Sequence, residues 1–497
     1  MKYPTRCALR ASISAVALVG FASLGLAPAA HAGDRGGGKG KGGGGHGDVV
    51  LEWNTLINEL LADSGSISLE NPGVATRSMA MMNLAIYDSV ALINGGDTFY
   101  DYDFGKPGKR SRKASAEVAA AQASYTVLSS IFGDTQQREL DAFRKASLGR
   151  VKDKAALALG TRVAESIIAE RADDGYDTFV RYLPSGEVGG WEPDPVNPDQ
   201  EAWGPAWGSV QTFAAGGVDS YLPPPPPDLT SRAYADAYNQ VKELGAIDST
   251  ARTDEQTEIG LFWAYDREGL GTPIALFNKA VQAVATEQDN TFEENAELFA
   301  MASVAMADAG IVAWNSKFEH DLWRPVSGIR QGDEDGNPLT VGVAGWTPLG
   351  APDGEELTGF TPPFPTYVSG HATFGGAVFE VLELWYGEDL AFTLSSAELE
   401  HLLLEENADL LAAYGLEGLE DAERTFTFSE AALENSDSRV YLGIHWDYDS
   451  IEGQLAGEAV ARSLFAGGFV ANPEPSTAAL LALGLTGVLA RRRASTP

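Results

Sequence analysis

The chain of 497 residues has a single cysteine, Cys7, and little positive charge, with 35 Lys and Arg against 70 Asp and Glu. Cys7 lies in a segment that we expect to be removed, so the mature chain would form no disulfide and would offer no thiol to an oxidant. The net charge of -35 makes nucleic acid an unsuitable partner. HExxH, P-loop and dinucleotide-binding glycine patterns are also missing. No internal apolar run approaches the length of a membrane span.

The first residues are typical of an export signal. A basic start precedes an apolar run over residues 13–26, and the segment ends in Ala30-His31-Ala32. We expect residues 1–32 to be removed, which moves the net charge from -35 to -38 because three basic residues leave with them: Lys2, Arg6 and Arg10. Residues 33–48 are rich in glycine and too polar to bury a core, which predicts a flexible linker.

The last residues form a tripartite tail over residues 471–497. Pro473-Glu474-Pro475 is followed by an apolar run over 478–490 and by three arginines, 491–493. The run is shorter than the roughly 20 residues that span a bilayer, which favours a sorting tail that is read and then cleaved. An apolar C-terminal helix is the alternative. The arrangement resembles the PEP-CTERM signal of Gram-negative bacteria. That resemblance implies exosortase-type processing, transient membrane association, and a periplasmic, outer-surface or matrix location.

The intervening residues predict an all-α fold, with two packed four-helix bundles and long loops over the active site. Strand-type alternation is scarce, and the loops are residues 191–229 and 325–367. We expect an N-terminal helical subdomain over 49–250 and a C-terminal one over 251–470 that carries the site. Helical periodicity is clearest in four segments: residues 75–92, 114–131, 152–172 and 292–318.

Three short basic segments stand out against the acidic background. In the first, Lys317 and Arg324 lie seven residues apart, or two helical turns, and Pro325 follows. Two cations at that spacing share a helix face. Because Pro325 disfavours helical geometry at the residue before it, we expect the helix to end at Arg324. Both cations would then point from a helix end into a cavity.

The second segment, Ser369-Gly370-His371, precedes a small, apolar run that is typical of a helix. Ser369 is a good N-cap, and Gly370 lets the backbone approach a ligand closely. Free N–H groups at a helix start bind anions. His371 would lie over that anion site, where it could give or take a proton near neutral pH.

The third segment holds Arg439, His445 and Asp449, and we expect Asp437-Ser438 to cap a helix in front of them. The spacing of four residues lets the Asp449 carboxylate accept from one imidazole nitrogen of His445. The other nitrogen is then free as a nucleophile or a ligand. Together the three segments predict a pocket for a tetrahedral oxyanion, either phosphate or a phosphate-like metal oxyanion.

The order and spacing of these segments resemble the signature of the superfamily that joins vanadium haloperoxidases with acid and lipid phosphatases. The flanking sequences are similar to the vanadium chloroperoxidase branch. They are residues 263–266, 323–328, 364–367 and 372–375. The resemblance covers about residues 52–465 and is strongest from residue 261 onward.

The resemblance implies an orthovanadate cofactor, with phosphate able to take the same site. His445 would bind vanadium, and His371 would be the acid–base toward hydrogen peroxide. The residues that would hold the vanadate oxygens are Lys317, Arg324, the Ser369 hydroxyl, the Gly370 N–H and Arg439.

Four further roles are implied by the same resemblance. Lys317 would also polarise the peroxide, and Asp449 would orient His445. Asp266 would pair with an active-site arginine, for which we choose Arg439. Phe364 is a candidate for the halide site, because bromide-preferring members tend to carry histidine at that position.

The implied function is an exported vanadium-dependent haloperoxidase that uses hydrogen peroxide to oxidise halide to a hypohalous-acid equivalent for a small organic acceptor. One alternative is a phosphatase acting on an exported phosphomonoester or phospholipid. In that reaction His445 attacks phosphorus to form a phosphohistidine, and His371 protonates the leaving alkoxide. Another alternative is a surface or matrix protein with a vestigial pocket. The chloroperoxidase-like flanks favour the haloperoxidase.

Overall fold

The computed structural model describes residues 48–63, 71–104, 114–149, 153–195, 198–199, 201–267, 269–352 and 359–469. The expected export signal, all of the expected linker except Asp48, and the expected sorting tail lie outside these described residues. Every described residue belongs to one unit, His46–Pro497.

Helices dominate the described residues, which include one two-stranded antiparallel sheet, and the all-α prediction is confirmed. In that sheet Ala391 pairs with Thr427 and Ser395 pairs with Glu423. The elements in chain order are α2 (Val49–Ala62), α4 (Pro72–Asn94), α5 (Ala116–Leu148), α6 (Lys154–Glu170), η2 (Trp207–Ser209), α7 (Arg232–Leu244), α8 (Asp254–Phe262), α9 (Pro273–Glu287), α10 (Phe292–His320), α11 (Pro325–Arg330), α12 (Gly370–Tyr386), β1 (Ala391–Ser395), α13 (Ala397–Leu402), η3 (Glu405–Asn407), α14 (Ala408–Ala413), β2 (Glu423–Thr427), α15 (Phe428–Tyr441) and α16 (Asp447–Ala466).

The four segments predicted from periodicity are helical and correspond to α4, α5, α6 and α10. Each helix begins after a residue whose side chain accepts first-turn N–H groups: Asn71, Ser115, Asp153 and Thr291. Such caps satisfy donors that have no partner inside the helix. Helix α5 continues through a kink at Gln136 to Leu148, well past the predicted end at residue 131.

The predicted end of α10 at Arg324 is wrong. The helix ends at His320, Asp321 takes a left-handed conformation with φ of 48°, and Arg324 is the N-cap of α11. Pro325 is the first residue of α11, a position that suits proline because no N–H donor is needed there. Lys317 and Arg324 therefore belong to different elements, and the turn between them sets their relative placement.

The predicted cap at Asp437-Ser438 is also wrong, because both residues lie inside α15 and its N-cap is Thr427. The Ser438 hydroxyl instead donates to the Asn435 carbonyl at 2.6 Å. Serine can make this bond within a helix, so a residue type that favours caps does not by itself mark a helix start. Arg439 consequently lies in the last turn of α15.

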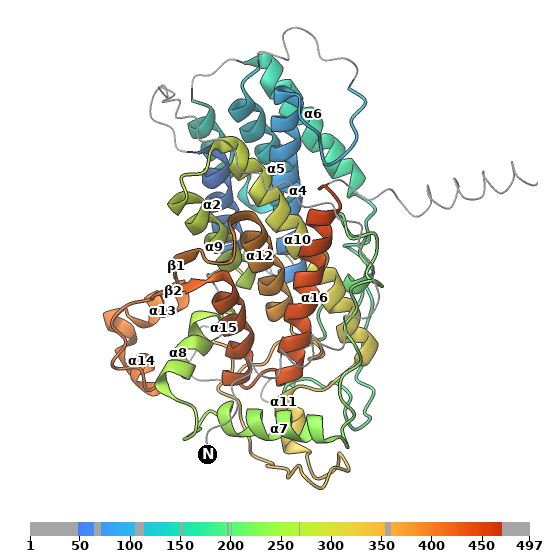
Figure 1. Ribbon diagram of the computed structural model, residues 1–497, viewed down its shortest axis with the longest axis vertical. Helices are drawn as coiled ribbons and strands as arrows, with labels where there is room; N and C mark the ends of the chain where they lie inside the picture. The colour runs from blue at the N-terminus through green and yellow to red at the C-terminus, as the bar shows by residue number, and fades with distance from the viewer. Residues whose placement is uncertain are drawn as a thin grey trace, which may run out of the picture. The chain divides into compact units, whose positions relative to one another are not determined.

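Helices α10, α12 and α16 run side by side through the middle of the molecule (Figure 1). The contact between α12 and α16 depends on glycine. A Cβ on Gly457 would lie 2.1 Å from the Thr373 carbonyl oxygen, and one on Gly376 would lie 2.4 Å from that of Gln454. Glycine alone permits backbones to approach this closely. The starts of α12 and α16 are therefore held next to each other.

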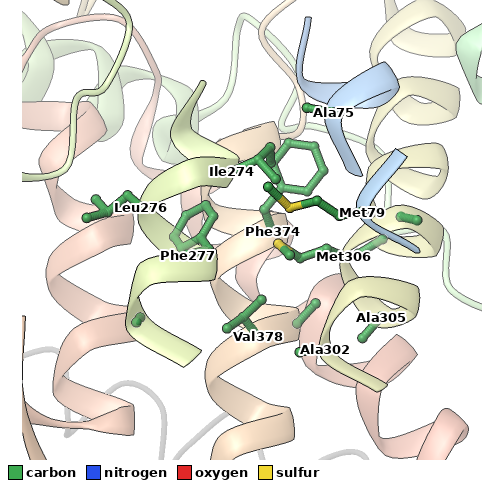
Figure 2. Close-up of a cluster of buried hydrophobic side chains, with 14 of the residues drawn as sticks. Ala75, Met79, Ile274, Leu276, Phe277, Ala302, Ala305, Met306, Phe374 and Val378 are labelled. Atoms are coloured by element: carbon green, nitrogen blue, oxygen red, sulfur yellow. The ribbon is translucent and has the colours of Figure 1, made fainter. Parts of the chain in front are cut away.

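A continuous apolar core packs between these helices and their neighbours. Figure 2 shows part of it, with side chains from α4, α9, α10 and α12 in one cluster. Phe277 of this cluster has its ring centroid 5.5 Å from that of His371. The labelled members are Ala75, Met79, Ile274, Leu276, Phe277, Ala302, Ala305, Met306, Phe374 and Val378.

Helices from both sides of the expected boundary near residue 250 share this core, and α4 packs directly on α10. The boundary and the division into two four-helix bundles stay predictions. The expectation that no internal run reaches membrane-span length is wrong for α10. An 18-residue window of this helix has a mean hydropathy of 1.5, but 94% of the window is buried, as in a core helix.

Candidate active site

Residues of the second and third basic segments line one cavity, and Lys317 and Arg324 of the first segment lie against Phe364 in its wall. Lys317 is in the last turn of α10, residues 369–371 form the start of α12, and Arg439 and His445 lie at the connection from α15 to α16. The cavity has a volume of about 40 Å³. Its lining includes Asp266, Trp314, Phe364, Gly370, His371, Arg439 and His445.

The start of α12 presents backbone N–H groups to the cavity. Ser369 is the N-cap, with its Oγ accepting from the Ala372 N–H at 3.3 Å and its own N–H donating to the Asp449 carbonyl at 2.9 Å. Gly370 lies so close to Trp314 that a Cβ would be 2.9 Å from the indole ring. The first-turn N–H groups have no carbonyl partner within the helix, and they stand at its positive end.

His445 is held from three directions. Its Nδ1 lies 3.0 Å from Asp449 Oδ2 and 3.0 Å from Thr366 Oγ1, and its Nε2 lies 3.0 Å from Arg324 Nη1. Because arginine only donates, Nε2 must accept, and we assign the ring proton to Nδ1. Asp449 Oδ2 also accepts the backbone N–H of Trp446, the N-cap of α16, at 3.0 Å. His445 lies just before α16. The bond from the Trp446 N–H therefore holds the Asp449 carboxylate at the helix start, within reach of the His445 ring four residues earlier.

Arg324 is buried, and backbone carbonyls accept two of its five N–H donors. Its Nε donates to the Phe364 carbonyl and its Nη1 to the Ile444 carbonyl, both at 2.9 Å. In the part of the chain that the structure describes, the buried Nη2 has no hydrogen-bond partner. Buried donors in that condition are uncommon in proteins. Arg324 can therefore donate to an anion that binds beside His445.

Arg439 lies beside both His371 and Asp266. Its Nη1 lies 3.5 Å from His371 Nδ1 and 3.7 Å from Asp266 Oδ2, the carboxylate that we expected beside it. Its Nη2 donates to the Trp263 carbonyl at 3.3 Å. His371 Nε2 is buried and makes no hydrogen bond to any described residue. That nitrogen is the one available to exchange a proton with a bound ligand.

Lys317 has a different placement from the one expected. Its Nζ donates to the carbonyls of Pro365 at 3.0 Å, Thr366 at 3.1 Å and Val368 at 2.6 Å. An ammonium has three N–H donors, so none remains to hold a ligand oxygen or a peroxide. Burial and the charge of Arg324 lower the pKa of Lys317, but only the charged ammonium donates to all three carbonyls. Lys317 therefore holds the loop before α12.

Phe364 lies between the cations and the cavity. Its ring centroid is 4.9 Å from Lys317 Nζ and 4.9 Å from Arg324 Cζ. Trp314 packs against it with centroids 5.1 Å apart. Aromatic edges carry partial positive charge, and the two cations lie just behind this wall.

Burial determines the charges of the histidines and arginines. It lowers the pKa of His371 and of His445 well below the usual value, and the neighbouring cation adds to this effect, Arg439 for His371 and Arg324 for His445. Both imidazoles are therefore neutral at neutral pH. Burial also lowers the pKa of Arg324 to about 9 and that of Arg439 to about 10, so both arginines keep their charge.

Two carboxyl groups partly balance the buried cations. Burial raises the pKa of Asp266 to about 6 against the effect of Arg439. Burial also raises the pKa of Asp449, against the Thr366 hydroxyl and the charge of Lys317. Positive charge remains in excess around the cavity, which favours an anionic guest.

The donors present fit a tetrahedral oxyanion that also takes one nitrogen ligand. They comprise the His445 Nε2 lone pair, the Arg324 Nη2 donor without a partner, and the first-turn N–H groups of α12. By contrast, no three or more His, Cys, Asp or Glu side chains gather to hold a metal cation among the described residues. Vanadate, with its oxygens on donors and vanadium on Nε2, fits this set.

Sequence reasoning missed three residues that shape the cavity. Thr366 contacts both His445 and Asp449, Trp314 packs on Gly370, and the Trp263 carbonyl accepts from Arg439. Trp263 belongs to a flank that was singled out by resemblance. Thr366 also belongs to such a flank, residues 364–367, but no spacing pointed to its contacts, because a threonine in a loop has no characteristic spacing.

Comparison with known proteins identifies relatives of this chain. Residues 297–467 match the family model described as the VCPO second helical-bundle domain. The chain is 31% identical over 485 residues to vanadium chloroperoxidase from Curvularia inaequalis, a match that covers 81% of this chain and 79% of that protein.

Two solved structures have a similar fold. The first bacterial vanadium-dependent iodoperoxidase has a TM-score of 0.61 at 24% identity and covers 84% of this chain and 95% of its own. A holo-type bacterial vanadium-dependent chloroperoxidase has a TM-score of 0.57 at 14% identity and covers 83% of this chain and 97% of its own. At these identities the likeness is one of fold.

Proposed function

The chain belongs to the vanadium haloperoxidase family, and we propose that it uses hydrogen peroxide to oxidise a halide to a hypohalous-acid equivalent at a vanadate bound in this cavity. Its enzyme class is vanadium-dependent haloperoxidase. The observation that carries the assignment to this cavity is the neutral His445, whose unprotonated Nε2 faces the buried Arg324. In a strongly acidic chain, these groups are arranged to receive an anion.

We propose that His445 Nε2 is the nitrogen ligand of the vanadate. Binding there would replace the hydrogen bond from Arg324 Nη1, which would then donate to a ligand oxygen together with Nη2. The Gly370 N–H and Arg439 would hold further oxygens, and Ser369 keeps the helix start in place. When bound, the vanadate supplies a Lewis-acidic centre that activates peroxide toward attack by halide.

His371 is the proposed proton-transfer residue. The overall reaction joins peroxide, halide and one proton to give hypohalous acid and water, so a group in the cavity must move protons between oxygen atoms. His371 is neutral, and because Nε2 has no partner among the described residues, the ring's hydrogen bond to the Trp263 backbone is made by Nδ1–H. Nε2 then holds the lone pair and can accept a proton from peroxide and return it to the departing water. Arg439 Nη1 lies 3.5 Å from Nδ1, so its positive charge is next to the ring.

Lys317 contributes through its charge and through the loop that it holds. Its three donors fix the carbonyls of residues 365, 366 and 368, which places Phe364 at the cavity wall. We propose that halide approaches along Phe364 and Trp314, where buried apolar surface excludes water and the cations attract the anion. A small organic acceptor would then react with the hypohalous-acid equivalent.

One assay tests the proposed function. The purified protein is loaded with vanadate, and halogenation of a phenolic dye is followed with peroxide and chloride, bromide or iodide. Hydrolysis of a phosphate ester is measured in parallel. Vanadate-dependent halogenation with at least one halide supports the proposal, and the three rates give the halide preference. Ester hydrolysis without halogenation would instead assign the cavity to phosphoryl transfer through His445.

We further propose that the protein is exported and loses both ends. This proposal rests on the sequence of residues 1–32 and 471–497 alone. Intact-mass analysis of the protein from its native membrane or medium fraction is the test. A mature chain that begins near residue 33 and ends near Pro475 is expected. A mass that includes Arg491 to Arg493 would contradict cleavage of the tail.

A further inference from the structure

Thr366 is fixed by its backbone on both sides. Its N–H donates to the Leu322 carbonyl at 2.9 Å, and its own carbonyl accepts from Lys317 Nζ at 3.1 Å. The residue is fully buried. Because the backbone cannot move without breaking these bonds, the hydroxyl of Thr366 has a defined position in the protein interior.

That hydroxyl completes a ring of three hydrogen bonds. Thr366 Oγ1 donates to Asp449 Oδ2 and lies 3.0 Å from His445 Nδ1, which itself lies 3.0 Å from the same carboxylate oxygen. Since Nδ1 carries the ring proton, the hydroxyl has its lone pairs toward Nδ1 and spends its own proton on Asp449. The Nδ1–H of His445 therefore has two acceptors, Thr366 Oγ1 and Asp449 Oδ2, and the first of these is itself hydrogen-bonded to the second.

The same contact joins two parts of the cavity. Thr366 lies three residues before Ser369, whose N–H donates to the Asp449 backbone carbonyl at 2.9 Å. The loop before α12 is therefore tied to Asp449 twice, once through the carboxylate and once through the carbonyl. These ties set the distance between the anion-binding start of α12 and the His445 ring.

We propose that Thr366 is a positioning residue, which keeps the Nε2 lone pair of His445 directed at the vanadate site through its hydroxyl. The proposal rests on the proposed function, because it concerns the residue that would bind vanadium. Without the hydroxyl, His445 Nδ1 keeps one acceptor in place of two, and Asp449 Oδ2 keeps the Trp446 N–H but loses the donor from the loop. The ring is then free to tilt about its remaining bond.

Three substitutions separate the hydroxyl from the shape of the side chain. Thr366→Val keeps the branched shape without the hydroxyl, Thr366→Ser keeps the hydroxyl, and Thr366→Ala removes it. The dissociation constant for vanadate is measured by equilibrium dialysis with vanadium analysis. Loss of a group that orients a metal-binding histidine typically weakens affinity about 10- to 100-fold. We expect that loss for valine and alanine and affinity within about threefold of the original for serine.

Thr340→Val is the matched control. Thr340 is buried and donates its hydroxyl to Asp335 Oδ2 at 2.7 Å, a bond of the same kind outside the cavity. This variant should lose stability in urea unfolding but keep vanadate affinity. If the valine variant of Thr366 does not fold, the serine and alanine variants, which differ only by the hydroxyl, make the same comparison.

The possible results distinguish this inference from the proposed function. If the unaltered protein binds no vanadate, the proposed function fails, and this inference fails with it. If the unaltered protein binds vanadate and the Thr366 variants bind it equally well, only the positioning role is overturned. Equal weakening by serine and alanine, or by Thr340→Val, would also overturn it, because the effect would then follow from packing or stability.

Discussion

Replacing Arg324 with lysine keeps the positive charge of the cavity but removes the planar fork of donors. Arg324 Nε reaches the Phe364 carbonyl, while Nη1 reaches both the Ile444 carbonyl and His445 Nε2. Lysine ends in a single nitrogen that cannot occupy these separate positions. We therefore expect Arg324→Lys to fold, with reduced stability, and to bind vanadate much more weakly.

The size of the effect follows from the donors of Arg324. Nη2, which has no partner in the described structure, would donate to a vanadate oxygen. A hydrogen bond to a charged group contributes about 1.5–3 kcal/mol, and about 1.4 kcal/mol corresponds to a factor of ten. The dissociation constant for vanadate should thus rise about 10- to 150-fold. Leaving the carbonyl of Phe364 or Ile444 without its donor should reduce the free energy of unfolding by about 1–3 kcal/mol.

Arg252→Lys provides the control for this substitution. Arg252 also donates to backbone carbonyls, with Nη1 2.6 Å from the Leu244 oxygen and 2.8 Å from the Ala246 oxygen, but it does not line the cavity. Its replacement should lower stability in urea unfolding and leave vanadate affinity unchanged in equilibrium dialysis. The reasoning is refuted if Arg324→Lys binds vanadate within about twofold of the original protein while Arg252→Lys shows the same loss of stability.

Three further substitutions test other parts of the argument. His445→Ala should abolish vanadate retention on dialysis, and normal retention would show that another residue is the ligand. His371→Ala should keep vanadate affinity but lower kcat in dye halogenation by about 100-fold or more, since it removes the proton-transfer group; an unchanged kcat contradicts that role. Burial in α4 raises the pKa of Asp88 from 3.8 to about 7. Protonated Asp88 therefore contributes to the free energy of unfolding fully below pH 3.8, and this contribution is lost as pH rises through 7. Between pH 5 and pH 8 this loss amounts to about 2–3 kcal/mol. The fall in the free energy of unfolding over that range should therefore be smaller by this amount in Asp88→Asn, and an equal fall in both proteins would refute the assignment.

Most of the helical fold could be predicted because its signals are local. Periodic apolar residues and capping side chains lie within a few positions of the helices that they define, as Thr291 does at the start of α10 and Ser369 at the start of α12. Signals that serve two structures gave the errors. Pro325 disfavours a helix before it but opens one after it, and serine caps a helix at Ser369 but bonds within a helix at Ser438.

The positions of the charged residues in the sequence identified the groups around the cavity but not how they divide its work. Lys317 and Arg324 were expected to do the same task. The path of residues 364–368 gives Lys317 three carbonyl acceptors, whereas Arg324 Nη2 has no acceptor among the residues that the structure describes. Every residue type has a backbone carbonyl, so the sequence does not show which carbonyls accept from Lys317. The different roles of Lys317 and Arg324 could therefore not be predicted. The difference has a physical consequence. Lys317 can act on a bound anion only through its charge and the loop, whereas Arg324 can also donate to the anion directly. Substitution of Lys317 should therefore move Phe364 and Thr366 and also change the charge near the cavity. Its effect on vanadate affinity cannot be separated from its effect on halide oxidation, whereas these two effects can be separated for substitutions of Arg324 and Thr366.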